Sequence, residues 1–131
     1  HQPLHAASDH DAGGNDKQVR AAGRAAGSLH HYWDTEFVRA LGKTPQAAAE
    51  RLIARTTPRQ IGEWSAGDPA RWAMQSFRAA RTHAYGKLPA PGADGVRELP
   101  PEYVANANRV VAQQLARAGV RLAMVLNEAL R

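Results

Sequence analysis

The chain contains no cysteine, so it can form neither a disulfide nor a thiolate metal site. Any bound metal must therefore be held by histidine and carboxylate side chains. Long apolar runs are also missing, and none approaches the roughly 20 residues that a membrane-spanning helix needs. The motif His-Glu-x-x-His does not occur, which argues against a zincin-type metalloprotease. Phenylalanine and tyrosine are few, whereas alanine and arginine are abundant.

A length of 131 residues, 44% of them hydrophobic, is sufficient for one domain with a real core. The alanine-rich composition favours helices, so we predict a mainly α fold with an irregular N-terminal loop region. The formal charge is +5, from 17 lysine and arginine residues against 12 acidic residues. Such a charge suits a polyanionic partner, although a solvated basic surface is the commoner cause.

Capping residues divide most of the chain into helices. Ser28 is expected to cap the first helix and Gly42 to end it. Three further helices are expected to begin at an N-cap residue followed by proline, at Thr44-Pro45, Thr57-Pro58 and Asp68-Pro69. Residues 1–27 lack helical periodicity, with a short strand at 17–20, and residues 87–100 are rich in proline and glycine. The predicted helices are therefore 28–41, 45–55, 58–64, 69–85 and a long one from residue 101 onward.

Two side chains that can bind metal share one face of the first predicted helix. At 100° per residue, His30 and Asp34 project from the face that carries Phe37 and Leu41. Burying an imidazole and a carboxylate there costs free energy unless the two are paired or bind a metal. Two explanations stay open at this point, a His–Asp hydrogen bond inside the core and an ion held by both residues.

His5, in the N-terminal loop, adds a third ligand of the right type. One nitrogen or oxygen ligand distant in sequence from an i, i+4 pair is the usual supply for a catalytic zinc with an open coordination position. A triad of Ser28 with a histidine and an aspartate can also be drawn. However, no nucleophile elbow surrounds this serine.

Three blocks of sequence together resemble the S1/P1 nuclease family, the zinc-dependent, single-strand-specific nucleases of the mung bean type. They are His1-Gln2-Pro3-Leu4-His5, Asp11-Ala12-Gly13-Gly14-Asn15 and Leu29-His30-His31-Tyr32-Trp33-Asp34. The resemblance continues through Trp72-Ala73-Met74-Gln75-Ser76 and residues 114–127, so it spans nearly the whole chain with order and spacing kept. Each block alone would be weak evidence, and the combination is highly specific.

The resemblance implies a phospholipase C/P1 nuclease-like helical fold whose active site holds three zinc ions. By resemblance, His5, His30 and Asp34 are the complete protein ligand set of one of these zincs, and a metal-bound water attacks the phosphodiester without a side-chain base. Asp11 is a candidate to hold the second ring nitrogen of a ligand histidine. Gly14 and Asn15 are expected to bind substrate, which would be RNA or single-stranded DNA. The family also implies a secreted or periplasmic protein and no membrane partner.

The family supplies its remaining zinc ligands upstream of the Gln-Pro-Leu-His block, and this sequence has no initiator methionine. We therefore expect residues 1–131 to be the C-terminal portion of a longer nuclease domain. Alone, it should bind about one zinc, cleave poorly and expose apolar surface around Trp33 and Val111. Two other functions remain open. One is a phospholipase C-like zinc phosphoesterase, and the other is a non-catalytic helical module with one structural zinc.

Overall fold

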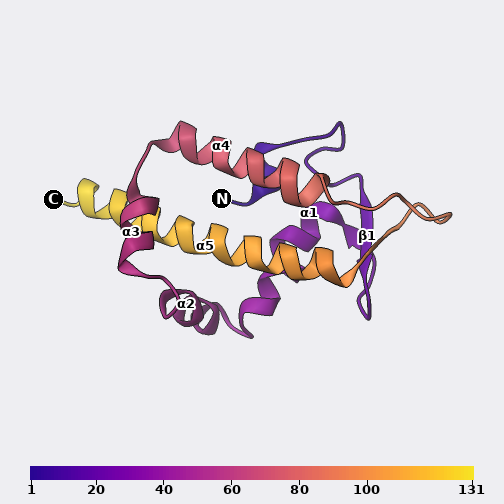
Figure 1. The fold of residues 1–131 in the computed structure, drawn as a ribbon, viewed down its shortest axis with the longest axis horizontal. Helices are drawn as coiled ribbons and strands as arrows, with labels where there is room; N and C mark the ends of the chain where they lie inside the picture. Colours follow the sequence, from indigo (N-terminus) through magenta and orange to yellow (C-terminus); the bar gives the residue numbers. More distant parts are fainter.

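A computed structural model describes residues 1–131 and confirms a mainly α fold (Figure 1). Helix α4 (Pro69–Ala79) and the long helix α5 (Pro101–Ala129) both run along the molecule, and hydrogen bonds from Gln114 to Ser76 and from Arg121 to Gln75 link them. The shorter helices α2 (Pro45–Ile53) and α3 (Pro58–Ser65) pack against α5 toward its C-terminal end. None of the helices combines the length and the apolar character that crossing a membrane requires.

The predicted caps form where the sequence places them. The side chain of Ser28 accepts a hydrogen bond from the His31 amide at 3.1 Å. Thr44 and Asp68 cap α2 and α4 in the same way, each followed by a proline at the start of the helix. Thr57 caps α3 within a reciprocal capping box. Local side-chain hydrogen bonds therefore determine where these helices begin.

The prediction of one continuous α-helix over residues 28–41 is wrong, because the segment changes its helix type twice. Helix α1 (Leu29–His31) widens into the π turn η2 (Tyr32–Glu36) and then tightens into the 3-10 turn η3 (Val38–Leu41). The π turn is closed by a hydrogen bond of 3.0 Å from the Phe37 amide to the Tyr32 carbonyl. Because a π turn holds more residues than an α turn, the side chain of Asp34 leaves the buried face and 40% of it is exposed.

A small sheet lies at one end of the helices. Its central strand β1 (Gln18–Ala21) pairs antiparallel with β2 (Gly27–Ser28) and parallel with β3 (Arg97–Leu99). The first strand was predicted to within one residue. The third lies in the segment predicted as loop, because three residues that pair with a distant strand leave no local pattern. Likewise, the 3-10 turn η1 (Pro3–Ala6) occurs inside the predicted N-terminal loop.

The core is built around aromatic side chains between the segment from α1 to η3, the sheet and α5. The indole of Trp33 donates to the hydroxyl of Tyr103 at 3.2 Å, and that hydroxyl donates to the Ala84 carbonyl at 2.8 Å. Trp33 and Val111 themselves are buried, since only 1% and 4% of these residues is accessible, and the apolar surface expected around them is limited to Leu115, which lines a pocket with both. Most of the other exposed large apolar side chains lie on α2, α3 and the C-terminal part of α5, and one lies on α4: Ile53, Ile61, Leu122, Val125, Leu126 and Met74.

Candidate metal centre

Three elements bring the predicted ligands to one place. His5 lies on η1, His30 on α1 and Asp34 on η2, and one ligand atom from each lies within 4.8 Å of the others. The Nε2 atom of His30 is 3.2 Å from Oδ2 of Asp34, and Nε2 of His5 is 3.9 Å from its Oδ1. The two imidazole rings stack with centroids 5.1 Å apart. Only His30 is largely buried, so the cluster opens to solvent.

These separations suit a metal ion. Ligand atoms around a tetrahedral zinc, with bonds of about 2.0–2.1 Å, are roughly 3.4 Å apart. The measured distances fall on both sides of that value. Two imidazole nitrogens and one carboxylate oxygen also form a donor set that zinc prefers, and three protein ligands leave one coordination position open.

The hydrogen bond on the far side of the His30 ring strengthens this assignment. Its Nδ1 lies 2.8 Å from the carbonyl oxygen of Gly13, which can only accept. Nδ1 therefore carries a proton, so in the neutral form of the ring the lone pair of Nε2 faces the carboxylate of Asp34. Two acceptors that face each other at 3.2 Å repel unless a cation lies between them. A proton could serve for this pair alone, whereas the nearby His5 nitrogen favours a metal ion.

Gln2 has a role that sequence reasoning missed. Its amide nitrogen donates to Oδ1 of Asp34 at 3.0 Å, and its amide oxygen accepts from the backbone amide of Leu4 at the start of η1. One side chain thus orients the candidate carboxylate ligand and caps the turn that carries His5. The position of Gln2 directly before Pro3, which stands at the start of a turn, was the available signal.

The loop that supplies the Gly13 carbonyl has an unusual backbone. His10, Ala12, Gly13 and Gly14 all have positive φ angles. A Cβ at Gly13 would lie 2.9 Å from the Leu4 carbonyl oxygen, and one at Gly14 would lie 3.1 Å from the Leu4 side chain. Both positions therefore need glycine for its conformation and for space.

These contacts correct the expectation that Gly14 binds substrate. Gly14 is buried, and its close neighbours are Leu4 and the backbone of His30, whose amide donates to the Gly14 carbonyl at 3.2 Å. Gly14 therefore packs against the protein itself, and little of it is accessible to a substrate. Asn15 is exposed, and its amide nitrogen donates to the Ala12 carbonyl at 2.8 Å.

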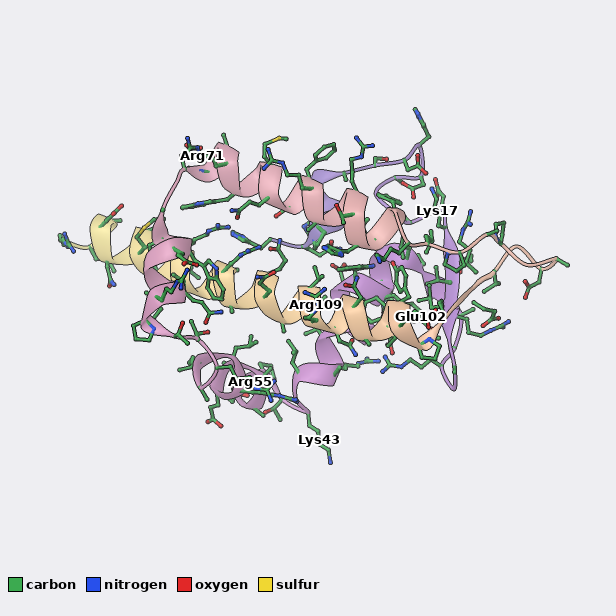
Figure 2. All side chains as sticks on the ribbon, viewed as in Figure 1. Lys17, Lys43, Arg55, Arg71, Glu102 and Arg109 are labelled. Carbon is green, nitrogen blue, oxygen red and sulfur yellow. The ribbon has the colours of Figure 1, made fainter.

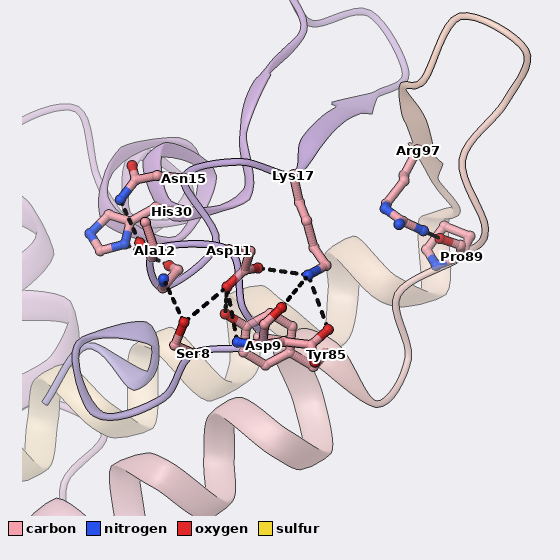
Figure 3. A network of polar contacts seen from close by, with 12 residues as sticks. Ser8, Asp9, Asp11, Ala12, Asn15, Lys17, His30, Tyr85, Pro89 and Arg97 are labelled. Carbon is pink, nitrogen blue, oxygen red and sulfur yellow. Dashed lines mark hydrogen bonds and ion pairs between the residues drawn. The ribbon is translucent and has the colours of Figure 1, made fainter.

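Asp11 contacts neither candidate ligand histidine, which corrects its expected role. Its buried carboxylate accepts hydrogen bonds from Lys17 at 2.8 Å, Tyr85 at 2.9 Å and the Asp9 amide at 3.0 Å (Figure 3). Asp11 therefore joins the loop of residues 10–14 to Lys17, directly before β1, and to η4 (Ala80–Tyr85), the π turn that continues α4. The loop it holds carries the carbonyl that orients His30.

The polar network shifts the ionisation of its members. Burial opposes ionisation of Asp11, but the hydrogen bonds from Lys17, the Asp9 amide and Tyr85 outweigh it and hold the pKa of Asp11 well below its usual range. Burial would lower the pKa of Lys17, yet the carboxylates of Asp11 and Asp9 raise it above its ordinary value. Burial and the Asp11 carboxylate together raise the pKa of Tyr85. At neutral pH, Asp11 and Lys17 are an ion pair.

A pocket of about 220 Å³ adjoins the cluster. Its lining includes the polar side chains of Gln2, Asp34 and Gln114 and the apolar side chains of Trp33 and Val111. Its walls thus combine one candidate ligand with apolar side chains. His31 is not part of the cluster, because its ring lies 3.8 Å from Glu36 and is half exposed.

Comparisons with known proteins agree with this arrangement of motifs. A family model described as S1/P1 Nuclease matches residues 1–131. Endonuclease 2 of Arabidopsis thaliana is 33% identical over an alignment that covers 97% of this chain and 46% of that protein. Endonuclease 1 of the same plant is 31% identical, with coverage of 97% and 44%. The chain therefore spans a little under half the length of these curated relatives.

Proposed function

This chain belongs to the S1/P1 nuclease family, and from that premise we propose that it forms part of a zinc-dependent endonuclease. Its reaction is hydrolysis of phosphodiester bonds in RNA and single-stranded DNA. As part of the same proposal, residues 1–131 form one unit of a longer nuclease domain that acts outside the cytoplasm. The similar proteins of Arabidopsis thaliana are all named endonucleases, which supports the reaction class.

The observation that carries the proposal is the convergence of His5, His30 and Asp34. A hydrogen-bonded His–Asp pair would explain two of these residues, but it would give no reason for the His5 ring to stack on His30. The protein also supplies the contacts that a metal site needs around its ligands. The Gly13 carbonyl sets the tautomer of His30, and the Gln2 amide orients Asp34.

Each residue has a definite part in the chemistry. The two imidazoles and the Asp34 carboxylate would hold the zinc ion, with a fourth position left for water or a phosphoryl oxygen. Bound zinc lowers the pKa of water, polarises the phosphoryl group and offsets the charge of the transition state. The exposed amide of Asn15 is proposed to contact a nucleobase. The net charge of +5 attracts the polyanionic substrate.

Zinc binding and cleavage by the 131-residue chain test the proposal. Metal analysis should give about one zinc per chain, since three nitrogen and oxygen ligands form one site. Cleavage of labelled single-stranded DNA and RNA should depend on zinc. It should be slow, because one ion cannot stabilise both the attacking and the leaving oxygen. The assay therefore uses protein in excess over substrate.

Two variants sharpen the test. Asp34→Asn should abolish both zinc binding and cleavage, whereas His31→Ala, which alters the adjacent solvent-facing histidine, should preserve both. Equal loss in the two variants at unchanged folding would show that the wrong histidine has been assigned. Zinc-dependent hydrolysis of phosphatidylcholine without nucleic acid cleavage would identify a phospholipase instead. Zinc that raises the melting temperature without supporting any turnover would identify a structural site.

A further inference from the structure

Two neighbouring helical segments carry basic side chains without acidic ones. From Pro69 to Lys87 the sequence has four lysine and arginine residues and no aspartate or glutamate. Helix α5 has glutamate only near its two ends, and between them it carries Arg109, Arg117 and Arg121. Because α4 and α5 lie side by side (Figure 1), these stretches meet along one groove. The positive charge is therefore concentrated in one part of the molecule.

A polar pocket of about 210 Å³ lies where the two stretches meet. Residues of α4 and η4 form one wall, and residues of α5 form the other; the basic ones are Arg78, His83, Arg109 and Arg117. No carboxylate lines the pocket. Figure 2 labels Arg109, which lies on the α5 side of this pocket.

None of these three arginines forms an ion pair within the chain. Elsewhere, six basic side chains are paired with carboxylates: Lys17, Arg20, Arg24, Arg39, Arg59 and Arg71. In the pocket, Arg109 donates to the amide oxygen of Asn106 at 2.7 Å, and Arg117 to that of Gln114 at 3.0 Å. The Nε atom of Arg117 is buried and has no partner. Converging guanidinium groups that lack a protein counter-charge are the usual composition of an anion site.

A chain of hydrogen bonds prepares a further donor. Since Asn106 accepts from Arg109 through its oxygen, its amide nitrogen faces Nδ1 of His83, at 3.2 Å. Nδ1 must then accept, so the neutral ring carries its proton on Nε2. Burial, together with the positive charges of Arg109 and Lys87, lowers the pKa of His83. The pocket thus has a positive potential and a neutral histidine donor.

Gln114 connects this pocket with the candidate metal centre. It lines both the basic pocket and the pocket that contains Asp34. Its amide nitrogen is fixed by the His1 carbonyl at 2.9 Å and by the Ser76 hydroxyl at 3.3 Å. The side chain of Gln114 therefore lies between the site of the proposed chemistry and the basic pocket.

We propose that the groove formed by Arg78, His83, Arg109 and Arg117 binds backbone phosphates of single-stranded nucleic acid beside the metal centre. This inference rests on the proposed nuclease function for the identity of its ligand. The guanidinium of Arg117 lies over the ring of Trp64, 5.8 Å from its centroid, but no phenylalanine, tyrosine or tryptophan lines the pocket itself. Guanidinium and imidazole donors in such a pocket contact phosphates rather than stack with bases. The groove therefore increases affinity for a strand without selecting its sequence.

The test measures binding by fluorescence anisotropy with a labelled 12-nucleotide oligothymidylate in EDTA, over a range of salt concentrations. EDTA prevents cleavage and removes binding through zinc. The test variant combines Arg78→Gln with Arg109→Gln, both exposed. The control combines Arg55→Gln with Arg131→Gln, two exposed arginines without ion pairs that lie outside the groove. Both variants lose two charges, and circular dichroism checks that both are folded.

Each phosphate contact on a single strand contributes about 0.7 to the slope of log affinity against log salt, so the test variant should lose about 1.4 from that slope. If the wild type and the test variant bind with equal affinity at 1 M salt, this difference in slope makes the variant bind about 25-fold more weakly at 0.1 M salt. The control should retain the wild-type slope. Equal slopes in the two variants would overturn the inference, as would displacement of the oligonucleotide by polyglutamate at a lower charge concentration than by unlabelled oligothymidylate. Absence of zinc-dependent cleavage with the expected slopes would overturn only the nuclease proposal.

Discussion

The Nδ1 atom of His30 lies 2.8 Å from the carbonyl oxygen of Gly13, seventeen residues earlier in the chain. This bond fixes the imidazole with its other nitrogen toward Asp34. The carbonyl itself is held by a backbone that only glycine adopts readily, with φ of 67°. The conformation of one glycine therefore determines which nitrogen of a candidate ligand is available.

Replacing this glycine should disrupt both stability and metal binding. In Gly13→Ala the new Cβ would meet the Leu4 carbonyl at 2.9 Å, so the loop must shift and carry the His30 acceptor with it. Gly23→Ala is the matched control, because Gly23 also has a positive φ, of 74°, but has no atom within 4 Å of the added Cβ. Strain alone should cost the control about 1 kcal/mol in unfolding free energy.

Urea unfolding and zinc titration of both variants check this prediction. Gly13→Ala should be the less stable of the two and should bind zinc about tenfold or more weakly, in line with other losses of contacts that orient ligands. The control should bind zinc as the wild type does. Equal zinc affinity in the two variants would contradict an orienting role for the Gly13 carbonyl.

Gln2→Ala should also weaken zinc binding, because the amide that donates to Asp34 at 3.0 Å is lost. We expect a decrease of about 10-fold or more in affinity, measured by competition with a zinc-binding dye. Gln46→Ala, an exposed substitution on α2, should leave the affinity unchanged. If Gln2→Ala retains wild-type affinity, Asp34 does not depend on this hydrogen bond for its orientation.

Local patterns explain how much of the fold was predictable. The starts of α2, α3 and α4 followed from cap and proline pairs, which act within one turn. The π turn over Tyr32–Glu36 was not predictable, because it depends on how Trp33 and Phe37 pack in the core. The strand β3 was missed because its partner lies far away in sequence.

In the candidate site, too, some residues could be predicted from the sequence and others could not. Residue type and spacing marked His5, His30 and Asp34 as candidates, because chemistry restricts which side chains bind zinc, and the family resemblance combined them into one predicted ligand set. The partners of these residues were missed or misassigned. Gln2 donates to Asp34, and a backbone carbonyl rather than Asp11 holds His30. Every residue has a backbone carbonyl, so a sequence does not show which one accepts a given hydrogen bond, and only a folded structure reveals it.

The hydroxyl of Tyr85 should contribute to stability through Asp11. Tyr85→Phe removes a hydrogen bond of 2.9 Å to a buried carboxylate, which should cost about 1.5–3 kcal/mol. Urea unfolding measures the loss. Combining the change with Asp11→Asn in a double-mutant cycle isolates the pairwise part, and an interaction energy near zero would show that the loss arises from packing alone.

The ionisation of Asp11 should appear in the pH dependence of stability. Since its pKa is lower in the folded chain than in the unfolded one, the unfolded state binds the proton more readily. The contribution of Asp11 is therefore complete above its unfolded pKa of about 3.9 and decreases as the pH falls below it. Over that acidic range the loss approaches about 1.4 kcal/mol per pH unit.

The difference in unfolding free energy between the wild type and Asp11→Asn isolates this contribution from the other acidic residues. In metal-free buffer, that difference should be constant from pH 5 to pH 7 and should shrink from about pH 4 downward, as the unfolded pKa requires. A carboxyl carbon titration by NMR gives the same information without any variant, and the Asp11 resonance should remain that of a carboxylate below pH 4. Parallel stability profiles, or a resonance that titrates with an ordinary midpoint, would show that Lys17 and Tyr85 do not hold Asp11 in its ionised form.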